Sequence, residues 1–322
     1  MVFYIMMTKK DPSIFVIVLN WNNSTDTVEC LKSFQKVQYD NYKIIVVDNN
    51  SEDNSVAEIR NFIESHEAEI LLIENNENSG FAGGNNVGIK HALESGADYV
   101  MVLNNDTTVD NSILRDLVNI AVENSNAGII TPAIYFSDNK DKLWFGGESG
   151  LNWIRMEHAI YSSLENKALP VGITDKRVNF LTGACMFIKE EVLRKIKGFD
   201  ERFFLYFEDA DFSLRTVNEG YDLLWTPKAK IWHKISSTTL PQAGSAIMNY
   251  YNVRNIMLLA KKHGPWWVRY FYMHIWAYYK FTKQLIKFAF PNKYNIDLAR
   301  AIMQGIQDYY RGKFGKYVTH RN

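Results

Sequence analysis

The sequence predicts an α/β protein with a mostly parallel sheet flanked by helices, followed by a helical C-terminal extension. Apolar runs of strand length alternate with amphipathic helical stretches over the first hundred residues. From Gly244 onward the pattern predicts three helices, broken near Gly264 and Pro265 and again near Pro291. The 322 residues suffice for one large α/β domain with an appendage. We therefore expect a domain over residues 1–243 and an extension over residues 244–322.

Four strands are predicted in order, at residues 14–19, 43–47, 69–73 and 99–103. A helix is predicted after each strand. The first runs from Ser24 or Thr25 to about Val37, the second begins at Asp53, the third ends at about Ser95, and the fourth covers residues 112–123. Further along, short strands are predicted at residues 129–135, 143–145, 178–181 and 184–188, a loop at 150–176, and helices at 190–196 and 208–219. After these the apolar run 223–225 precedes Pro227. All of the first four strands end in segments rich in Asn and Asp. The polar chemistry is therefore expected at one edge of the sheet.

Charge divides the chain unevenly although the net charge is zero. Residues 261–322 hold 12 Lys and Arg against 2 Asp and Glu, while the preceding residues hold 24 against 34. This balance suggests that the tail meets something anionic, and no nucleic acid is expected as a partner. Aromatic residues alternate with cations over residues 265–290, which is typical of a helix in a membrane interface. The alternative is an aromatic helix packed on the domain or in a homodimer.

Location is predicted from what the sequence lacks. The first ten residues show no signal peptide pattern, and the uncharged run Tyr270–Tyr279 is about half of the ~20 residues that a spanning helix needs. Cys30 and Cys185 lie near apolar residues and are expected to be reduced core thiols. We therefore expect a cytoplasmic protein, placed peripherally on the inner face of the cell membrane if the tail binds lipid.

The ends of the first, second and fourth strands carry candidate donor-binding and metal-binding groups. Asn104, Asn105 and Asp106 offer oxygen ligands that suit Mg²⁺ or Mn²⁺ on a nucleotide diphosphate, although the same segment is typical of a turn that ends a strand. Asp48, with Asn20 and Asn50 nearby, is placed to accept hydrogen bonds from a base or ribose. The alternative for Asp48 is a helix or turn cap.

A glycine-rich segment over residues 78–88 opens the third helix. Its backbone amides at a helix N-terminus favour a phosphate, with Gly80, Phe81, Gly83 and Asn85 as candidate donor contacts. The alternative is that the glycines serve only the turns. Neither the G-x-G-x-x-G fingerprint nor the Gly-Lys-Ser/Thr of a P-loop is present, so those two phosphate sites are not supported.

Residues 198–211 join an aromatic run to the carboxylates Glu208, Asp209 and Asp211. Because like charges repel, one of these acids is expected to have a raised pKa and to act as a general base, unless they merely favour the first turn of a helix. A lone histidine such as His233 is usually a core residue, and it becomes a metal ligand only if the fold brings it to Asp106.

Taken together and in this order, these segments strongly resemble the family-two glycosyltransferases of the GT-A fold over roughly residues 13–260. The segment Asn78–Asn85 looks most like the rhamnosyltransferase branch, which builds bacterial or archaeal surface polysaccharides. The resemblance implies that Asp106 is the last carboxylate of the Asp-x-Asp metal motif and that His233 completes the metal shell. It also implies that Asp48 contacts the base and that Asp209 is the catalytic base.

The chain departs from that family pattern at Asn104, which replaces the first acid of the metal motif. A carboxamide is a weaker, neutral ligand, so tight metal binding is expected to need the phosphates of the nucleotide. Arg254 lies in a Tyr-Tyr-x-x-Arg-Asn segment similar to one in rhamnosyltransferase-like members. It is expected either to clamp a phosphate of the donor or lipid carrier, or to form a structural ion pair.

The activity expected from the resemblance is inverting, metal-dependent transfer of a sugar from a nucleoside diphosphate donor to a hydroxyl of a glycan or lipid-linked acceptor. Rhamnose from dTDP-rhamnose is the first expectation, and a UDP-linked hexose is the second. Two other classes remain open. A catalytically idle scaffold would bind no nucleotide in a metal-dependent way, and a nucleotidyltransferase would release pyrophosphate.

Overall fold

The computed structural model describes residues 11–65, 69–147, 150–159, 167–234, 245–288, 290 and 295–318. The first ten residues, part of the predicted loop at 150–176, the break near Pro291 and the boundary between residues 243 and 244 lie outside the described residues. The predicted division into two domains therefore stays a prediction.

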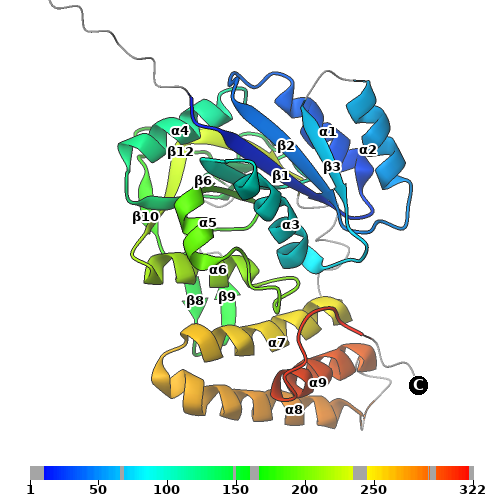
Figure 1. The fold of residues 1–322 in the computed structure, drawn as a ribbon. Helices are drawn as coiled ribbons and strands as arrows, with labels where there is room; N and C mark the ends of the chain where they lie inside the picture. Colours follow the sequence, from blue (N-terminus) through cyan, green and yellow to red (C-terminus); the bar gives the residue numbers. More distant parts are fainter. Residues whose placement is uncertain are drawn as a thin grey trace, which may run out of the picture.

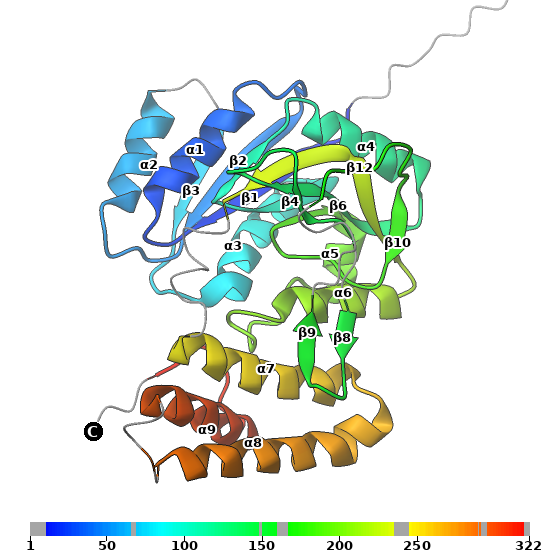
Figure 2. The same ribbon diagram turned by 180° about the vertical axis from the view of Figure 1, so that it is seen from behind.

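Strands and helices alternate in the first part of the chain, as predicted. They are β1 (Ile14–Asn20), α1 (Ser24–Phe34), β2 (Tyr42–Asp48), α2 (Ser55–Glu64), β3 (Ile70–Glu74), α3 (Gly80–Glu94), β4 (Tyr99–Asn104), β5 (Thr107–Val109) and α4 (Ile113–Glu123). Strands β3, β2, β1 and β4 are neighbours in this order, and every pair among them is parallel. Helix α3 covers one face of these strands, and α1 and α2 cover the other (Figures 1 and 2).

The second half of the sheet is mixed. Its elements are β6 (Ala127–Phe136), β7 (Leu143–Phe145), β8 (Gly150–Asn152), β9 (Glu157–Ala159), β10 (Lys176–Val178), β11 (Cys185–Lys189), α5 (Glu190–Ile196), α6 (Glu208–Asn218) and β12 (Asp222–His233). Strand β11 is antiparallel to both β4 and β6, whereas β12 is parallel to β6. The expected α/β fold with a mostly parallel sheet flanked by helices is confirmed. The antiparallel pairings in this sheet are those of β11 and of the short strands β5, β7 and β10. The short strands β8 and β9 fall where a loop was predicted.

Strand β12 contains the apolar run 223–225 and extends well past Pro227. The sequence suggests an end at Pro227, because proline donates no hydrogen bond to a strand ladder. The pairing of β12 with β6 instead shifts register between Thr226 and Lys230 and then continues to His233. A bulge of this kind lets a strand pass a proline and go on. This continuation carries His233 to the edge of the sheet where β5 begins.

The C-terminal extension consists of α7 (Ala246–His263), the π-helix η1 (Val268–Tyr272), α8 (Met273–Phe288) and α9 (Ile296–Tyr310). The three predicted helices are confirmed, and they form a tier below the sheet in Figure 1. Their apolar core also contains Phe180, Phe203 and Ala210 from the first part of the chain. The extension therefore shares a core with the loop before α6. None of the described helices is long and apolar enough to cross a membrane.

Candidate active site

The polar ends of β1, β2 and β4 meet at one edge of the sheet, as predicted. Asn20 is paired in register with Asp48, and Leu19 with Asn104. These residues come from strands that are 28 to 84 positions apart in the sequence. Because parallel strands all end at the same edge, their terminal side chains surround one region. The expectation that the polar strand ends gather at one edge of the sheet is therefore confirmed.

Asp48 is held by hydrogen bonds within the protein. Its Oδ1 accepts from Asn20 Nδ2 at 2.8 Å and from Ser51 Oγ at 2.6 Å, and its Oδ2 accepts from the Ser51 backbone N–H at 2.8 Å. The side chain is almost fully buried. The turn that it caps places the exposed Asn50 in the left-handed region, at φ +60°. Asp48 thus shapes the loop after β2, and its contact with a base remains a prediction.

A second chain of hydrogen bonds links this turn to the end of β4. Asn105 Nδ2 donates to Thr27 Oγ1 at 2.9 Å, and Thr27 Oγ1 donates to Asn20 Oδ1 at 2.7 Å. Asn105 is therefore fixed to α1 by its side chain. Thr27 and Ser51 were missed by the sequence reasoning, because each is an ordinary polar residue near a helix or turn and only the fold brings it to Asn20.

Asp106 and His233 come together, although 127 positions separate them in the chain. Strand β5 pairs with the end of β12, which sets Thr107 opposite His233. The backbone N–H of Lys234 donates to the Asp106 carbonyl at 2.9 Å. His233 Nε2 then lies 3.0 Å from Asp106 Oδ1, and both side chains are buried. The condition under which His233 was expected to be a metal ligand is met.

The surroundings of His233 fit a divalent cation. Both ring nitrogens are buried and, among the described residues, neither has a hydrogen bond. The edge of Trp144 packs against the ring at a centroid distance of 4.7 Å, which fixes its orientation. A buried imidazole without hydrogen bonds beside a carboxylate is costly unless a ligand completes it. The described residues nevertheless contain no group of three or more His, Cys, Asp or Glu placed to hold an ion. Other oxygens, such as those of Asn104 and of a donor diphosphate, would have to complete the shell.

The glycine-rich segment has a different role from the one expected. Helix α3 already begins at Gly80, and its first amides, from Phe81 and Ala82, both donate to the carbonyl of Phe204, at 2.7 and 3.4 Å. The Gly80 amide donates to Asn78 Oδ1. These donors are occupied, so the prediction that they hold a phosphate is not supported. Gly80 is needed instead for its φ of +74° and because a Cβ there would collide with Phe204.

The other residues of this segment serve packing. A Cβ at Gly83 would lie 2.7 Å from Ser79 Cβ, and one at Gly88 would lie 2.6 Å from the Ile17 side chain of β1. Asn85, predicted to contact the donor, is buried and donates to the Phe81 carbonyl. Gly88 therefore lets α3 approach the sheet closely, and Gly83 leaves room for Ser79 at the start of the helix. The donor-binding role expected for Phe81, Gly83 and Asn85 stays a prediction.

Asp209 lies in the first turn of α6, and the short segment before β11 ties it to the metal side of the site. Its Oδ2 accepts from the Gly183 backbone N–H at 3.0 Å. The backbone carbonyl of the next residue, Ala184, accepts a hydrogen bond from the backbone N–H of Asn104 at 3.0 Å. Two adjacent residues thus hold the end of β4 and the start of α6 at a fixed separation. Hydrogen bonds to Gly183 and Ala184 therefore connect the predicted base to the predicted metal motif.

The three acids at the start of α6 have different environments. Burial, together with the neighbouring charge of Asp209, raises the pKa of Glu208 well above its ordinary value. Glu208 Oε2 is buried and has no hydrogen bond among the described residues. The expectation that one acid of the cluster has a raised pKa is confirmed for Glu208, and it does not apply to Asp211.

Glu208→Gln is expected to stabilise the protein near neutral pH. A raised pKa means that the folded protein binds the proton more tightly than the unfolded chain does. The free energy of unfolding therefore falls as pH rises above about 4.5 and through the folded-state pKa. The neutral amide removes this loss. Thermal unfolding at about pH 5 and about pH 8 should show a smaller pH dependence for Glu208→Gln than for the exposed control Glu64→Gln. Equal pH dependence would contradict the assignment.

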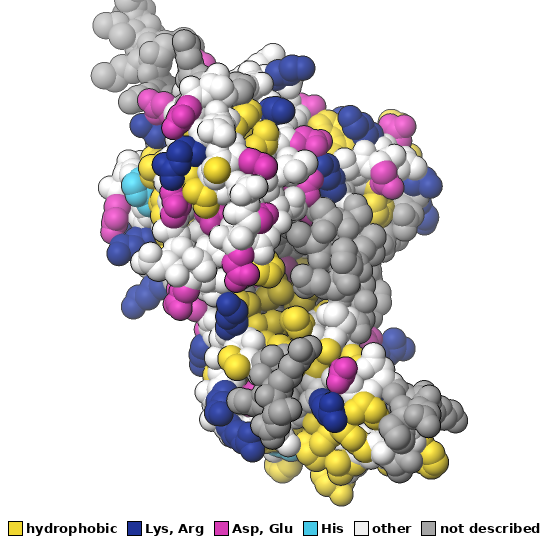
Figure 3. Space-filling view, turned by 90° about the vertical axis from the view of Figure 1, so that its right-hand side faces the viewer, with side chains coloured by type: hydrophobic (Ala, Val, Ile, Leu, Met, Phe, Trp, Pro, Cys, Tyr) yellow, Lys and Arg dark blue, Asp and Glu magenta, His cyan; other side chains and the backbone are white. Residues whose placement is uncertain are grey.

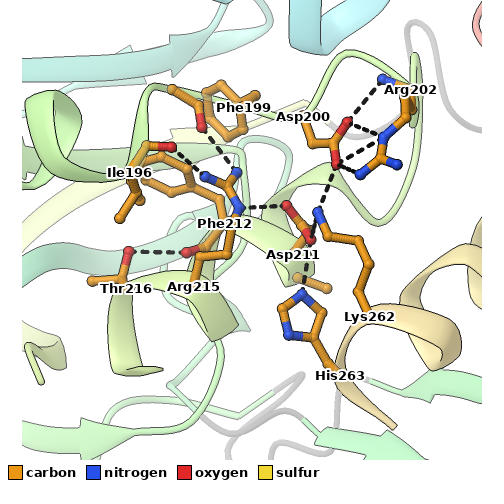
Figure 4. Close-up of polar contacts among 12 residues, drawn as sticks. Ile196, Phe199, Asp200, Arg202, Asp211, Phe212, Arg215, Thr216, Lys262 and His263 are labelled. Carbon is orange, nitrogen blue, oxygen red and sulfur yellow. Dashed lines mark hydrogen bonds and ion pairs between the residues drawn. The ribbon is translucent and has the colours of Figure 1, made fainter. Parts of the chain in front are cut away.

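Asp211 belongs to an ion network that joins α6 to α7 (Figure 4). Its Oδ2 accepts from Arg215 at 2.6 Å, and its Oδ1 contacts His263 at 2.8 Å and Lys262. Burial alone would raise the pKa of Asp211, but the His263 hydrogen bond and the charges of Arg215 and Lys262 outweigh it and lower that pKa. Lys262 also reaches Asp200 at 2.6 Å. Asp211 therefore anchors the extension and is not a candidate base.

The loop before α6 has an unusual backbone. Phe204, Tyr206 and Phe207 all have positive φ values, from +63° to +71°, which is costly for aromatic residues. Asn255 holds this loop by donating from Nδ2 to the carbonyls of Phe203, Leu205 and Tyr206, each at 2.8 Å. Residues outside the loop therefore stabilise a strained conformation immediately before the predicted base.

Arg254 is a structural residue, which corrects its predicted role as a phosphate clamp. It is fully buried in α7. Its guanidinium donates to the carbonyls of Gly315 at 2.7 Å, Phe203 at 3.0 Å and Arg202 at 3.2 Å, and to Asn255 Oδ1 at 2.9 Å. The partners are neutral, so the alternative of a structural ion pair is also not what the structure shows. The guanidinium N–H groups of Arg254 are therefore used within the protein and are not free to bind a ligand phosphate.

Comparisons with known proteins agree with this architecture. A model of the family described as "Glycosyl transferase family 2" matches residues 15–197, more than half of the chain. The chain is 24% identical over 260 residues to the dTDP-rhamnosyl transferase RfbF of Shigella flexneri, covering 79% of this chain and 82% of that protein. It is 29% identical over 211 residues to the low-salt glycan biosynthesis hexosyltransferase Agl10 of Haloferax volcanii. That match covers 65% of this chain and 62% of the Haloferax protein, so the chain spans less than two thirds of that relative.

A solved structure with a similar fold is the mannosyltransferase PcManGT from Pyrobaculum calidifontis in complex with GDP-Man and Mn²⁺. The two structures superpose with a TM-score of 0.57, and the match covers 94% of this chain and 88% of that chain. The sequences are only 14% identical, so the comparison shows a shared fold and nothing finer.

Proposed function

Because the chain belongs to glycosyl transferase family 2 and has the GT-A fold, we propose that it moves a sugar, with inversion, from a nucleoside diphosphate donor to an acceptor hydroxyl. That it is a glycosyltransferase follows from the family. The observation that carries the finer proposal is the contact between His233 and Asp106. A buried imidazole without hydrogen bonds beside a carboxylate, at the ligand-binding edge of the sheet, is suited to an ion that a diphosphate also contacts.

The chain's own residues divide the chemistry between two sides of the site. Asp106 and His233, with Asn104 at the end of β4, would hold Mg²⁺ or Mn²⁺, and the ion would supply positive charge to neutralise the departing diphosphate. Asp209 takes the proton of the acceptor hydroxyl. The hydroxyl oxygen bonds to the anomeric carbon of the sugar, and the bond from that carbon to the diphosphate breaks. The segment from Gly183 to Ala184 keeps the two sides in register.

Rhamnose from dTDP-rhamnose is our first proposal for the donor. It is supported by the Shigella relative, which is named a dTDP-rhamnosyl transferase and is matched over most of its length. A UDP-linked hexose is the second proposal, and the name of the Haloferax relative, a hexosyltransferase of glycan biosynthesis, favours a hexose. For the acceptor we propose a glycan or lipid-linked hydroxyl in surface polysaccharide synthesis. Such an acceptor would place the protein in the cytoplasm on the inner face of the cell membrane.

Asp106→Ala and His233→Ala are each expected to weaken donor binding in the presence of Mn²⁺ and to change it little without the ion. Each variant removes one of the three proposed side-chain ligands, and the described residues hold no group of three or more His, Cys, Asp or Glu that could replace it. A loss of about 10- to 100-fold in metal-dependent affinity is expected. Calorimetric titration with dTDP-rhamnose, UDP-glucose and UDP-galactose, with and without Mn²⁺, measures both the loss and the preferred donor.

The matched control for this titration is Asp116→Ala, an acid on α4 whose side chain caps its own helix through Ser112. It should bind the donor as the wild type does. If the folded wild type binds none of the three donors in a metal-dependent way, the scaffold alternative is favoured. In that case Asn104→Asp, which restores the first acid of the metal motif, is the variant to titrate next.

A further inference from the structure

The outward face of α8 is apolar and exposed. Ile275, Tyr278, Tyr279 and Ile286 have exposed fractions between 58 and 73%, and Phe271 of η1 continues the same surface at 60%. Within α8 the other three follow Ile275 by three, four and eleven positions, and these spacings place all four on one side of the helix. We call these five residues the α8 outer face.

The opposite side of α8 already packs against the protein. Met273, Trp276 and Ala277 are buried in the core that α8 shares with α7 and α9. In Figure 1, α8 lies at the lower end of the molecule, with α7 between it and the sheet. The outer face therefore has no function in holding α8 to the rest of the chain. A helix that is apolar on both sides is normally covered on both sides.

Cations flank the α8 outer face. Lys283 lies over the ring of Tyr279 at 5.9 Å, Lys280 over Trp276 at 5.3 Å, and Arg300 of α9 over Phe288 at 6.0 Å. Figure 3 shows Lys and Arg beside the hydrophobic side chains at the lower end of the molecule. Burial is the main cause that lowers the pKa of Lys280, the charges of Lys283 and Lys287 add to this effect, and the charge of Glu157 opposes it.

Acidic groups do not balance these cations in the described part of the extension after residue 260. Asp308 is buried beneath Tyr250, and Asp297 pairs with Arg300 on the surface. The surface thus combines exposed aromatic and aliphatic side chains with an excess of Lys and Arg over Asp and Glu in the described part of the extension. Self-association through this face would bring like charges together, so a second copy of the chain is a poorer occupant than an anionic surface.

We propose that the α8 outer face docks on the surface of an anionic lipid membrane, with the helix lying in the plane of the interface. Its 16 residues span about 24 Å, which is shorter than the ~30 Å hydrocarbon core of a bilayer. The apolar side chains enter the boundary between headgroups and acyl chains, and the flanking cations meet the headgroup phosphates. This inference does not depend on which sugar the protein transfers.

The test is flotation of the full-length protein with vesicles of phosphatidylcholine alone and of equal parts phosphatidylcholine and phosphatidylglycerol. The wild type is expected to float with the anionic vesicles, less as salt is raised, and to stay at the bottom with the neutral ones. Ile275→Ser with Tyr278→Ser should lower the partition coefficient about tenfold or more, since two apolar side chains are lost. Lys283→Glu should lower it by a similar factor on anionic vesicles.

The matched control is Val122→Ser, which changes an exposed apolar residue of α4, outside the C-terminal extension. This variant should float as the wild type does. All variants change exposed side chains, so melting temperature and donor binding should stay at the wild-type values. Wild-type protein that remains at the bottom with anionic vesicles overturns the proposal. So does a double serine variant that floats normally. Sedimentation velocity without lipid tests the alternative that a second copy of the chain binds this face. A wild-type dimer that becomes a monomer in the double serine variant would assign the face to a second copy.

Discussion

Asp209→Asn is expected to lower the turnover number by about 100- to 10,000-fold, the range typical for the loss of a general base. The amide has no basic lone pair to take the acceptor proton, yet it is nearly the same size as the carboxylate. Donor affinity should change little, because in the proposed mechanism Asp209 acts on the acceptor hydroxyl and not on the donor. Turnover, measured as nucleoside diphosphate released in the presence of acceptor, and calorimetric donor binding separate these two quantities.

The structure also predicts what this substitution does to stability. The two oxygens of Asp209 accept from the backbone N–H groups of Gly183 and Ala210. Asn keeps only one acceptor, so about 1 kcal/mol of unfolding free energy should be lost. Glu219→Gln at the other end of α6 is the matched control, and both its turnover and its stability should stay near the wild-type values. Full turnover in Asp209→Asn would remove Asp209 from the mechanism.

The parallel part of the fold was predictable because its signals are local. Four apolar strands of Val, Ile and Leu, three of them buried and each ending in polar residues, are sufficient to indicate a doubly wound sheet and the edge where ligands bind. The mixed part was less predictable because its pairings depend on partners far along the chain. Strand β12 shows this clearly, since its own Pro227 suggests an end that the neighbouring β6 overrides through a bulge.

The same distinction applies to the site. The pairing of Asp106 with His233 was anticipated only through the family resemblance, because a lone histidine in an apolar context has no local signal for metal binding. The glycine-rich segment gave a misleading signal. Glycine at a helix start suits a phosphate and close helix packing equally well, and only the structure shows that the Phe204 carbonyl occupies the amides. A carbonyl from a loop some 120 residues away cannot be foreseen from the glycines themselves.

Arg254→Ala is expected to destabilise the protein by about 3–5 kcal/mol, the largest loss among the substitutions considered. The side chain is fully buried, and its removal takes the Arg254 donor from the Gly315 carbonyl and leaves the Phe203 carbonyl with Asn255 as its donor. The cation also lies between aromatic rings, 5.2 Å from that of Tyr250 and 5.0 Å from that of Tyr251. Urea unfolding of the full-length protein measures the change.

Arg254→Lys separates this structural role from a phosphate clamp. A lysine keeps the charge but has three donors on a single nitrogen, so it cannot reach the carbonyls on both sides of the guanidinium. Stability should therefore fall in Arg254→Lys as well, while donor affinity at a temperature where the variant is folded should be nearly unchanged. Arg300→Ala, an exposed arginine of α9, should change stability by no more than about 0.5 kcal/mol. Weakened donor binding without a loss of stability would restore the clamp, and it would require the buried guanidinium to turn away from the loop that it supports.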